Sequence, residues 1–194
     1  MILGRFSRQG SLAVINDGRG RHFRLCHDCG FARLGGRGEA SHHHPSTGRS
    51  CGGTLQLLDL GHTFVSDIAE FCVPSLTKSD PAFRASILAA LLVGAHRALG
   101  VKQADLDGVG YMEHGAPIFA LFDDVPGGAG LAREAFSRIR EVLDEAMRVC
   151  ASCTCGEHSS CYGCLRSYRN QHEHELLDRT AAGEALGTIL QLAR

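Results

Sequence analysis

The chain has no tryptophan, few aromatic residues (6%) and only two lysines among its 194 residues. No apolar stretch approaches the eighteen residues that a membrane helix needs, since Gly94 and His96 interrupt the longest one. The first residues do not form a basic segment followed by an apolar core and a small-residue cleavage site. These absences argue against membrane-associated and secreted classes, and they predict a soluble protein of the cytoplasm.

An excess of charge of one sign is also missing, because 20 basic residues face 21 acidic ones and the formal net charge is −1. Such a balance gives no global electrostatic signal of a nucleic-acid-binding protein. The first fifty residues, however, hold eight arginines against three acidic residues, and arginine is well suited to contact phosphates. A GC-rich genome would also produce this arginine excess, so composition leaves DNA binding open.

Strand-like and helix-like segments alternate along the chain, which predicts an α/β fold, with α+β as the alternative. We expect a mixed sheet with two long helices, plus two excursions that zinc holds in place. Helices are predicted over 81–99, up to Val149 and over 180–192. The first of them has the clearest ends, because Asp80 can cap it, Pro81 suits its first position and Gly100 can close it.

Nine cysteines are a high number for a chain without a secretory signal, and close cysteine pairs in such a chain indicate metal thiolates rather than disulfides. The strongest cluster supplies four thiolates within twelve residues: Cys153, Cys155, Cys161 and Cys164. Four thiolates complete a closed tetrahedral zinc site, which is structural rather than catalytic. Cys150 can replace Cys153 in this set; we favour Cys153, because Cys150 lies at the end of a helical pattern.

A second, variant zinc site is predicted near the N-terminus. Cys26 and Cys29 have the spacing of a zinc-knuckle half, and Cys51 supplies a third thiolate. One histidine of the run His42, His43 and His44 can complete the set; we choose His44, and the other two stay open. A long loop between Cys29 and Cys51 needs something to hold it, which also favours a metal. Two zinc ions per chain are therefore expected.

These clusters suggest two domains. Residues 1–60 would contain the N-terminal strands with a zinc-ribbon-like insert at 26–51, and residues 61–194 would form the α/β domain that ends in the four-cysteine site.

A glycine-rich turn lies between an apolar strand and a helix, where free backbone N–H groups can bind phosphate. The glycines that can do so are Gly127, Gly128 and Gly130. A tight turn that needs positive φ angles explains the same glycines without any ligand. Three nearby acidic residues suggest a metal-dependent nuclease as an alternative: Asp123, Asp124 and Glu113. No base or nucleophile accompanies them in a recognisable arrangement, so no catalytic residue is assigned.

Polar and aromatic residues follow the four-cysteine cluster directly. Arg166, Arg169 and Tyr168 are predicted to contact nucleic acid, through backbone phosphates or by stacking on bases. Asn170 and His174 are expected to have a structural role beside the metal.

The run CTCGEHSSCYGCLRSYRNQHEHELLDR resembles the terminal signature of the MrfA-like zinc-binding (MZB) domain. Members of that family stand at the C-terminus of many DEAD/DEAH-box helicases and of DrmB-type proteins of DISARM defence. Upstream, LFDDVPGGAGLAREA resembles the glycine turn of the family, and LAVINDGRGRHFRLCHDCGFA and LDLGHTFVSDI resemble segments of its longer members. The resemblance implies that Cys153, Cys155, Cys161 and Cys164 are zinc ligands. It also implies a helicase-associated domain over 61–194.

Two features depart from that family. A second all-cysteine site would be expected upstream, whereas here a histidine must substitute. More seriously, the chain contains no GxxxxGK[ST] motif and no Asp-Glu-x-His or Asp-Glu-Ala-Asp box. We therefore expect no enzymatic activity, and interpret the chain as a separate subunit or a C-terminal fragment.

The predicted function is a zinc-binding accessory domain in DNA repair or antiviral phage defence. Its partners would be DNA and a superfamily 2 helicase core that supplies ATP hydrolysis, without any membrane. The alternatives are the nuclease and a module that binds only protein.

Overall fold

The computed structural model describes residues 3–35, 41–74, 76 and 80–192, and these fall into two compact units. One unit comprises Met1–Gly10 and Val65–Arg194, and the other comprises Ser11–Phe64. The first ten residues thus belong with the C-terminal part of the chain, whereas the sequence analysis grouped them with residues up to 60. Two long strands, β1 (Leu3–Asn16) and β7 (Leu60–Cys72), each contribute to both units.

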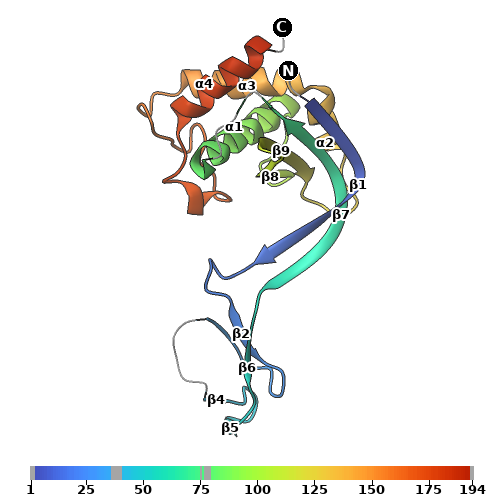
Figure 1. The fold of residues 1–194 in the computed structure, drawn as a ribbon, viewed down its shortest axis with the longest axis vertical. Coiled ribbons are helices and arrows are strands. Elements are labelled where there is room, and N and C mark those ends of the chain that lie inside the picture. Colours follow the sequence, from blue (N-terminus) through green and yellow to red (C-terminus); the bar gives the residue numbers. More distant parts are fainter. Residues whose placement is uncertain (1–2, 36–40, 75, 77–79, 193–194) are drawn as a thin grey trace. The chain divides into compact units, whose positions relative to one another are not determined.

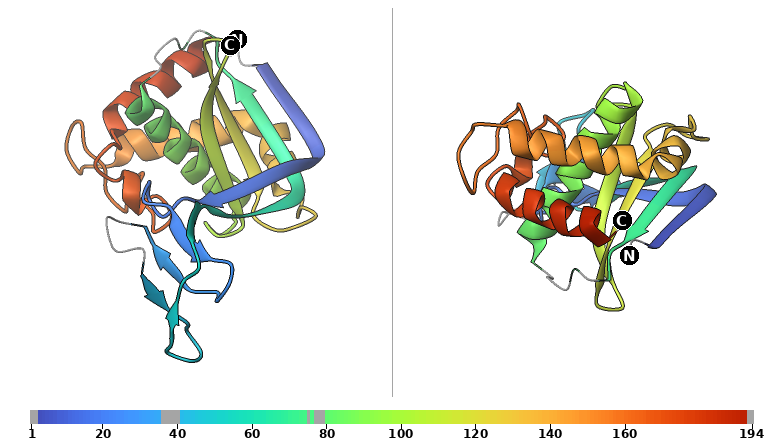
Figure 2. Two further views of the ribbon diagram at one scale, coloured as in Figure 1. Left: turned by 60° about the horizontal axis from the view of Figure 1, so that its bottom comes forward. Right: turned by 90° about the horizontal axis from the view of Figure 1, so that it is seen from above.

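The larger unit contains a four-stranded sheet in the order β1-β7-β9-β8, with β8 at Leu106–Glu113 and β9 at Ala116–Asp123. Strand β9 pairs antiparallel with both β7 and β8. Because these neighbours are antiparallel, the α+β alternative describes the fold. Residues Phe119 and Leu121 of β9 are fully buried and belong to the same core as the helices. Figure 2 shows how the helices gather beside the strands.

Helix α1 (Pro81–Leu99) has the predicted ends and forms the centre of the core. The Asp80 carboxylate accepts a hydrogen bond from the Ala82 N–H at 3.0 Å, and Gly100 ends the helix with φ of 68°. Length and composition alone would let this helix cross a membrane, but 56% of the stretch is buried inside the protein. A Cβ atom at Gly94 would lie 2.3 Å from the carbonyl oxygen of Val142, so glycine allows a close approach to α3.

The helix predicted to end near Val149 consists of two helices, α2 (Leu131–Ser137) and α3 (Ile139–Ser152). The break lies at Arg138, where φ is −110° and ψ is 29°. The Arg138 guanidinium donates to the Ala98 carbonyl oxygen at 2.8 Å and therefore ties this break to the end of α1. A short 3-10 helix, η1 (Gln171–Glu173), and the last helix, α4 (Arg179–Leu192), follow. Figure 1 shows α1, α3 and α4 packed together.

Besides the parts of β1 and β7 that it contains, the strands described in the smaller unit are short. Strand β2 (Phe23–Cys26) pairs antiparallel with β3 (Ala32–Leu34) and with β6 (Leu55–Leu58). A separate two-stranded ribbon joins β4 (His42–His43) to β5 (Ser50–Cys51). Among the large apolar side chains described here, Leu57 and Ile15 are exposed, so apolar burial alone provides little stability to this unit.

Candidate metal centres

Four cysteines meet directly after helix α3. Cys153 follows the last helical residue, and the ligand atoms of Cys153, Cys155, Cys161 and Cys164 all lie within 4.8 Å of one another. The Sγ–Sγ distances are 3.6 Å from Cys153 to Cys161 and 3.8 Å from Cys155 to Cys164. A tetrahedral zinc ion with Zn–S bonds of about 2.3 Å separates its sulfurs by about 3.8 Å. The donor set and its spacing therefore fit zinc.

Backbone N–H groups orient two of these sulfurs. The Cys161 N–H donates to Cys164 Sγ at 3.2 Å, and the Gly163 N–H donates to Cys161 Sγ at 3.3 Å. The carbonyl oxygen of Cys161 accepts hydrogen bonds from the N–H groups of Cys164 and Arg166, both at 3.0 Å. This tight turn places the last two cysteines on the same side of the backbone and prepares them for one cation.

The thiols of the cluster differ in acidity. A backbone N–H bond at Cys155 lowers the pKa of Cys153 to about 7, whereas burial raises the pKa of Cys164 to about 12. A zinc ion bound here would favour the thiolate form of all four sulfurs and would hold them in place. Cys150 lies outside the cluster; it is buried, and burial raises the pKa of its thiol to about 11. The structure thus places Cys153, rather than Cys150, in the group.

Helix α4 anchors the cysteine segment, a role that the sequence analysis missed. The Arg179 guanidinium donates to the carbonyl oxygens of Cys150 at 2.6 Å and Gly156 at 2.8 Å. Asp178 Oδ2 lies 2.9 Å from His158 Nδ1, and this contact raises the pKa of His158. Asp178 and Arg179 are the last two residues of the run that resembles the MZB signature. Only this position in the sequence indicated that they contact the cysteine segment.

The second group of metal-ligating side chains comprises Cys26, Cys29, His42 and Cys51, whose ligand atoms also lie within 4.8 Å of one another. Cys26 Sγ and Cys51 Sγ are 3.9 Å apart, as tetrahedral zinc requires. His42 is only 4% exposed, and its ring stacks on Phe31 with centroids 5.1 Å apart. Three thiolates and one imidazole form a common structural zinc set, so this donor set fits zinc as well.

The choice of His44 as the fourth ligand is corrected to His42. In the β4–β5 ribbon, His42 lies opposite Cys51, and side chains of successive strand residues point to opposite faces. His43 is therefore exposed. His44 turns away with the hairpin, and its Nδ1 lies 3.0 Å from the Ser46 hydroxyl. A sequence pattern of three adjacent histidines does not reveal this register.

The glycine-rich turn binds a carboxylate of the protein itself, which agrees with the tight-turn interpretation and leaves its N–H groups occupied by internal acceptors. The fully buried Asp123 accepts hydrogen bonds from the N–H groups that open helix α2: Ala129, Gly130 at 2.6 Å, Leu131 at 3.2 Å and Ala132 at 2.6 Å. The N–H groups of Gly127 and Gly128 donate to the carbonyl oxygens of Val65 and Val125. Every N–H group proposed for phosphate thus has an internal acceptor. The positive φ angles of all three glycines match a tight turn.

The acidic residues of the nuclease alternative do not come together. Asp123 is fully buried, and Asp124 forms an ion pair with Arg169. Glu113 lies at the opposite end of the β8–β9 pair from Asp123, on the order of 20 Å away at the usual rise per strand residue. These three residues therefore form no metal site of the kind that such a nuclease needs.

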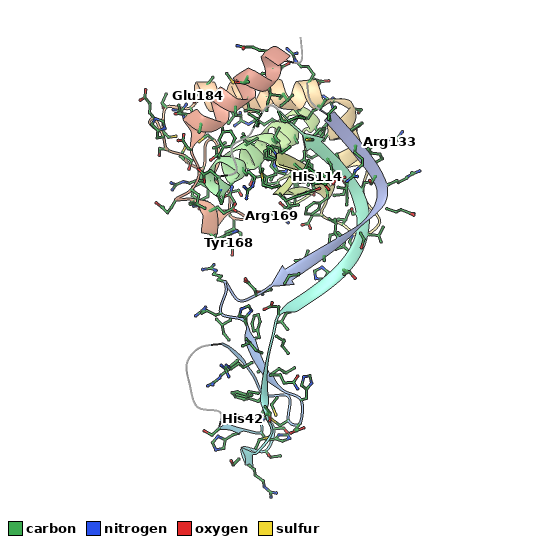
Figure 3. The ribbon with its side chains drawn as sticks, viewed as in Figure 1. His42, His114, Arg133, Tyr168, Arg169 and Glu184 are labelled. Carbon is green, nitrogen blue, oxygen red and sulfur yellow. The ribbon has the colours of Figure 1, made fainter. Side chains whose placement is uncertain are left out.

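The segment after the four-cysteine cluster presents aromatic side chains to solvent. Tyr168 is 80% exposed, and Tyr162, which the sequence analysis did not select, is 70% exposed. Arg166 Nε donates to Ser160 Oγ at 2.9 Å. Asn170 and His174 bond backbone groups of their own segment. Asn170 accepts from the Ser167 N–H and donates to the Leu165 carbonyl oxygen, and His174 Nε2 lies 3.0 Å from the Ser167 carbonyl oxygen. Figure 3 shows Tyr168 and Arg169 next to each other in this segment.

Comparison with known proteins connects the larger unit to one family. The model of the MrfA Zn-binding domain (MZB) matches residues 87–165, which confirms the resemblance drawn from the sequence over that segment. The Druantia protein DruE of Escherichia coli (strain UMEA 4076-1) is 27% identical over 201 residues. That alignment covers 88% of this chain and 11% of DruE, so the chain spans about a ninth of the length of this relative.

Solved structures of the DUF1998 helicase MrfA are also similar. The structure bound to DNA is 20% identical, with 79% of this chain and 20% of that chain covered and a TM-score of 0.49. The structure bound to DNA and AMPPNP is 17% identical, with 75% and 18% covered and a TM-score of 0.45.

Proposed function

We propose that this chain, whose residues 87–165 match the MrfA Zn-binding domain family, is a non-catalytic zinc-binding accessory domain or subunit of a DNA helicase system. The observation that carries this proposal is the closed four-cysteine cluster, all four members of which lie inside the matched segment. Four thiolates leave a zinc ion no open coordination position, so each metal would stabilise structure rather than activate water. The system would act in the cytoplasm in DNA repair or phage defence.

DNA binding would use the segment that follows the cluster. Tyr162 and Tyr168 hold their rings in solvent on a backbone that the cysteine turn fixes. Exposed aromatic rings stack on unpaired bases without regard to sequence. Arg166 lies on the same segment and can contact the phosphate backbone. Docking on the ATPase core of a superfamily 2 helicase is the second part of the proposal, because the chain itself has no ATPase motif.

A module that binds only protein is the second candidate. The observation that favours it is the net charge of −1, together with the acidic partners that already occupy Arg169.

Anisotropy of a labelled single-stranded or forked DNA at low salt distinguishes the two candidates. We expect wild-type chain to bind, and Tyr168→Ala to weaken binding by about five- to 150-fold, since each stacked base contributes about 1–3 kcal/mol. Leu176→Ala is the matched control, because Leu176 is 45% exposed and lies outside the aromatic pair. Absence of any DNA affinity, with or without a helicase core, would leave the protein-binding module.

A further inference from the structure

Arg169 bridges two aspartates from a different part of the chain. Its Nη1 lies 2.7 Å from Asp107 Oδ2, and its Nη2 lies 2.6 Å from Asp124 Oδ2. The same Nη2 approaches the Ala104 carbonyl oxygen at 3.5 Å. These contacts join Arg169, in the segment that follows the cysteine cluster, to one end of the β8–β9 pair. Both terminal nitrogens, which a phosphate would need for a bidentate contact, already face carboxylates.

The two aspartates are held in position by backbone contacts of their own. Asp107 Oδ1 accepts a hydrogen bond from the Gly108 N–H at 2.8 Å, which leaves Oδ2 for Arg169. The Asp124 N–H donates to the Asp105 carbonyl oxygen at 3.2 Å, which fixes the backbone beside Asp123. Asp123 itself is locked by the N-terminus of α2. The acidic partners are therefore part of the rigid scaffold, whereas Arg169 reaches them with a long side chain.

Arg169, Asp107 and Asp124 together have a net charge of one negative unit, and the exposed Tyr168 precedes Arg169 in the chain. A single guanidinium cannot neutralise two carboxylates, so in this state the site repels a DNA phosphate. The ion pairs are also open to water, because the side chain of Arg169 is 39% exposed and those of Asp107 and Asp124 are 31% exposed. Solvated ion pairs of this kind are weak enough to exchange partners.

We propose that Asp107 and Asp124 compete with DNA phosphate for Arg169 and thereby set the affinity of the site for single-stranded DNA. This inference rests on the proposed DNA-binding function and names how that site is regulated. DNA binding would release the guanidinium from the two carboxylates and transfer it to a phosphate beside a base that stacks on Tyr168. The apparent affinity is then reduced by the fraction of molecules in which Arg169 is held by the aspartates.

The test compares the variant Asp107→Asn/Asp124→Asn with wild-type chain, both loaded with zinc, by anisotropy of labelled single-stranded DNA across a salt series. We expect about three- to tenfold tighter binding at low salt, the size that two exposed ion pairs allow. The slope of log affinity against log salt should also become steeper by about 0.7, because one additional phosphate is neutralised.

Two controls separate release of Arg169 from a general change of charge. Glu175→Gln/Glu184→Gln removes the same two charges from exposed positions, and Figure 3 shows Glu184 on α4, away from Arg169. It should bind like wild type. In an Arg169→Gln background, the two aspartate substitutions should no longer steepen the salt slope, and the gain in affinity should be smaller than in the wild-type background. Melting curves of all variants verify that the fold is retained.

If wild type binds and the aspartate variant behaves like the glutamate control, this inference is refuted while the proposed function stands. If the gain in affinity and the steeper salt slope both persist undiminished without Arg169, the competition is likewise refuted. If neither wild type nor the aspartate variant binds DNA, both the inference and the DNA-binding function are refuted.

Discussion

Substitution of Asp123 by Asn should destabilise the protein far more than the same substitution at the adjacent Asp124. The Asp123 carboxylate is fully buried and accepts hydrogen bonds from four successive backbone N–H groups, at Ala129 through Ala132. An asparagine has only one acceptor oxygen, and its NH₂ group is a donor that would face other N–H donors without any acceptor. The negative charge opposite the helix N-terminus would also be lost.

The magnitude follows from these contacts. Hydrogen bonds to a charged group contribute about 1.5–3 kcal/mol each, but four that share one carboxylate are not additive. Loss of an N-cap costs about 1–2 kcal/mol, and each buried N–H left without an acceptor adds to that cost. We therefore expect Asp123→Asn to lower the free energy of unfolding by about 3 kcal/mol. For a chain of this size that corresponds to a decrease in Tm of about 6–12 °C.

Chemical denaturation followed by circular dichroism measures the effect. Asp124→Asn is the matched control, because the Asp124 side chain is 31% exposed and loses only one ion pair, worth at most about 1 kcal/mol. Equal stabilities of the two variants would refute the conclusion that the glycine turn exists to bind the Asp123 carboxylate.

Two further predictions concern the cysteine cluster and pH. Cys153→Ser should release one zinc ion per chain and expose 153–164 to protease, whereas Cys150→Ser should retain both ions. Metal analysis combined with limited proteolysis checks this prediction. Equal loss of zinc from the two variants would contradict it. The hydrogen bond from Arg5 lowers the pKa of Glu70 from its usual value of 4.5. The ionised Glu70 carboxylate therefore stabilises the fold above pH 4.5, and this stabilisation is lost as the pH falls through the lowered pKa. Glu70→Gln should therefore reduce the free energy of unfolding at pH 7 but not at pH 2, and a difference that is independent of pH would contradict the assignment.

Features with local causes were predictable from the sequence. Helix α1 begins and ends where Asp80, Pro81 and Gly100 place its ends, because capping involves only neighbouring residues. The four-cysteine cluster was equally readable, since its ligands lie within twelve residues. By contrast, the break at Arg138 depends on a contact with Ala98, forty residues away, so no local sequence pattern predicts the break.

Features that depend on long-range register were not predictable. His42 rather than His44 joins the cysteines because β4 pairs with β5. Three adjacent histidines in the sequence do not reveal that pairing. The partners of Arg169 are 62 and 45 residues away in sequence, so no local pattern showed that two carboxylates hold its guanidinium. The glycine turn has the composition of a phosphate-binding loop, yet Asp123 provides the anion from within the chain.

The central claim is that two structural zinc ions hold this chain together, one at each cysteine group. Native mass spectrometry of the purified chain, with His42→Ala and His44→Ala measured alongside, tests it directly. We predict two zinc ions in wild type, two in His44→Ala and one in His42→Ala. Fewer than two zinc ions in wild type, or loss of zinc from His44→Ala instead of His42→Ala, would contradict the account.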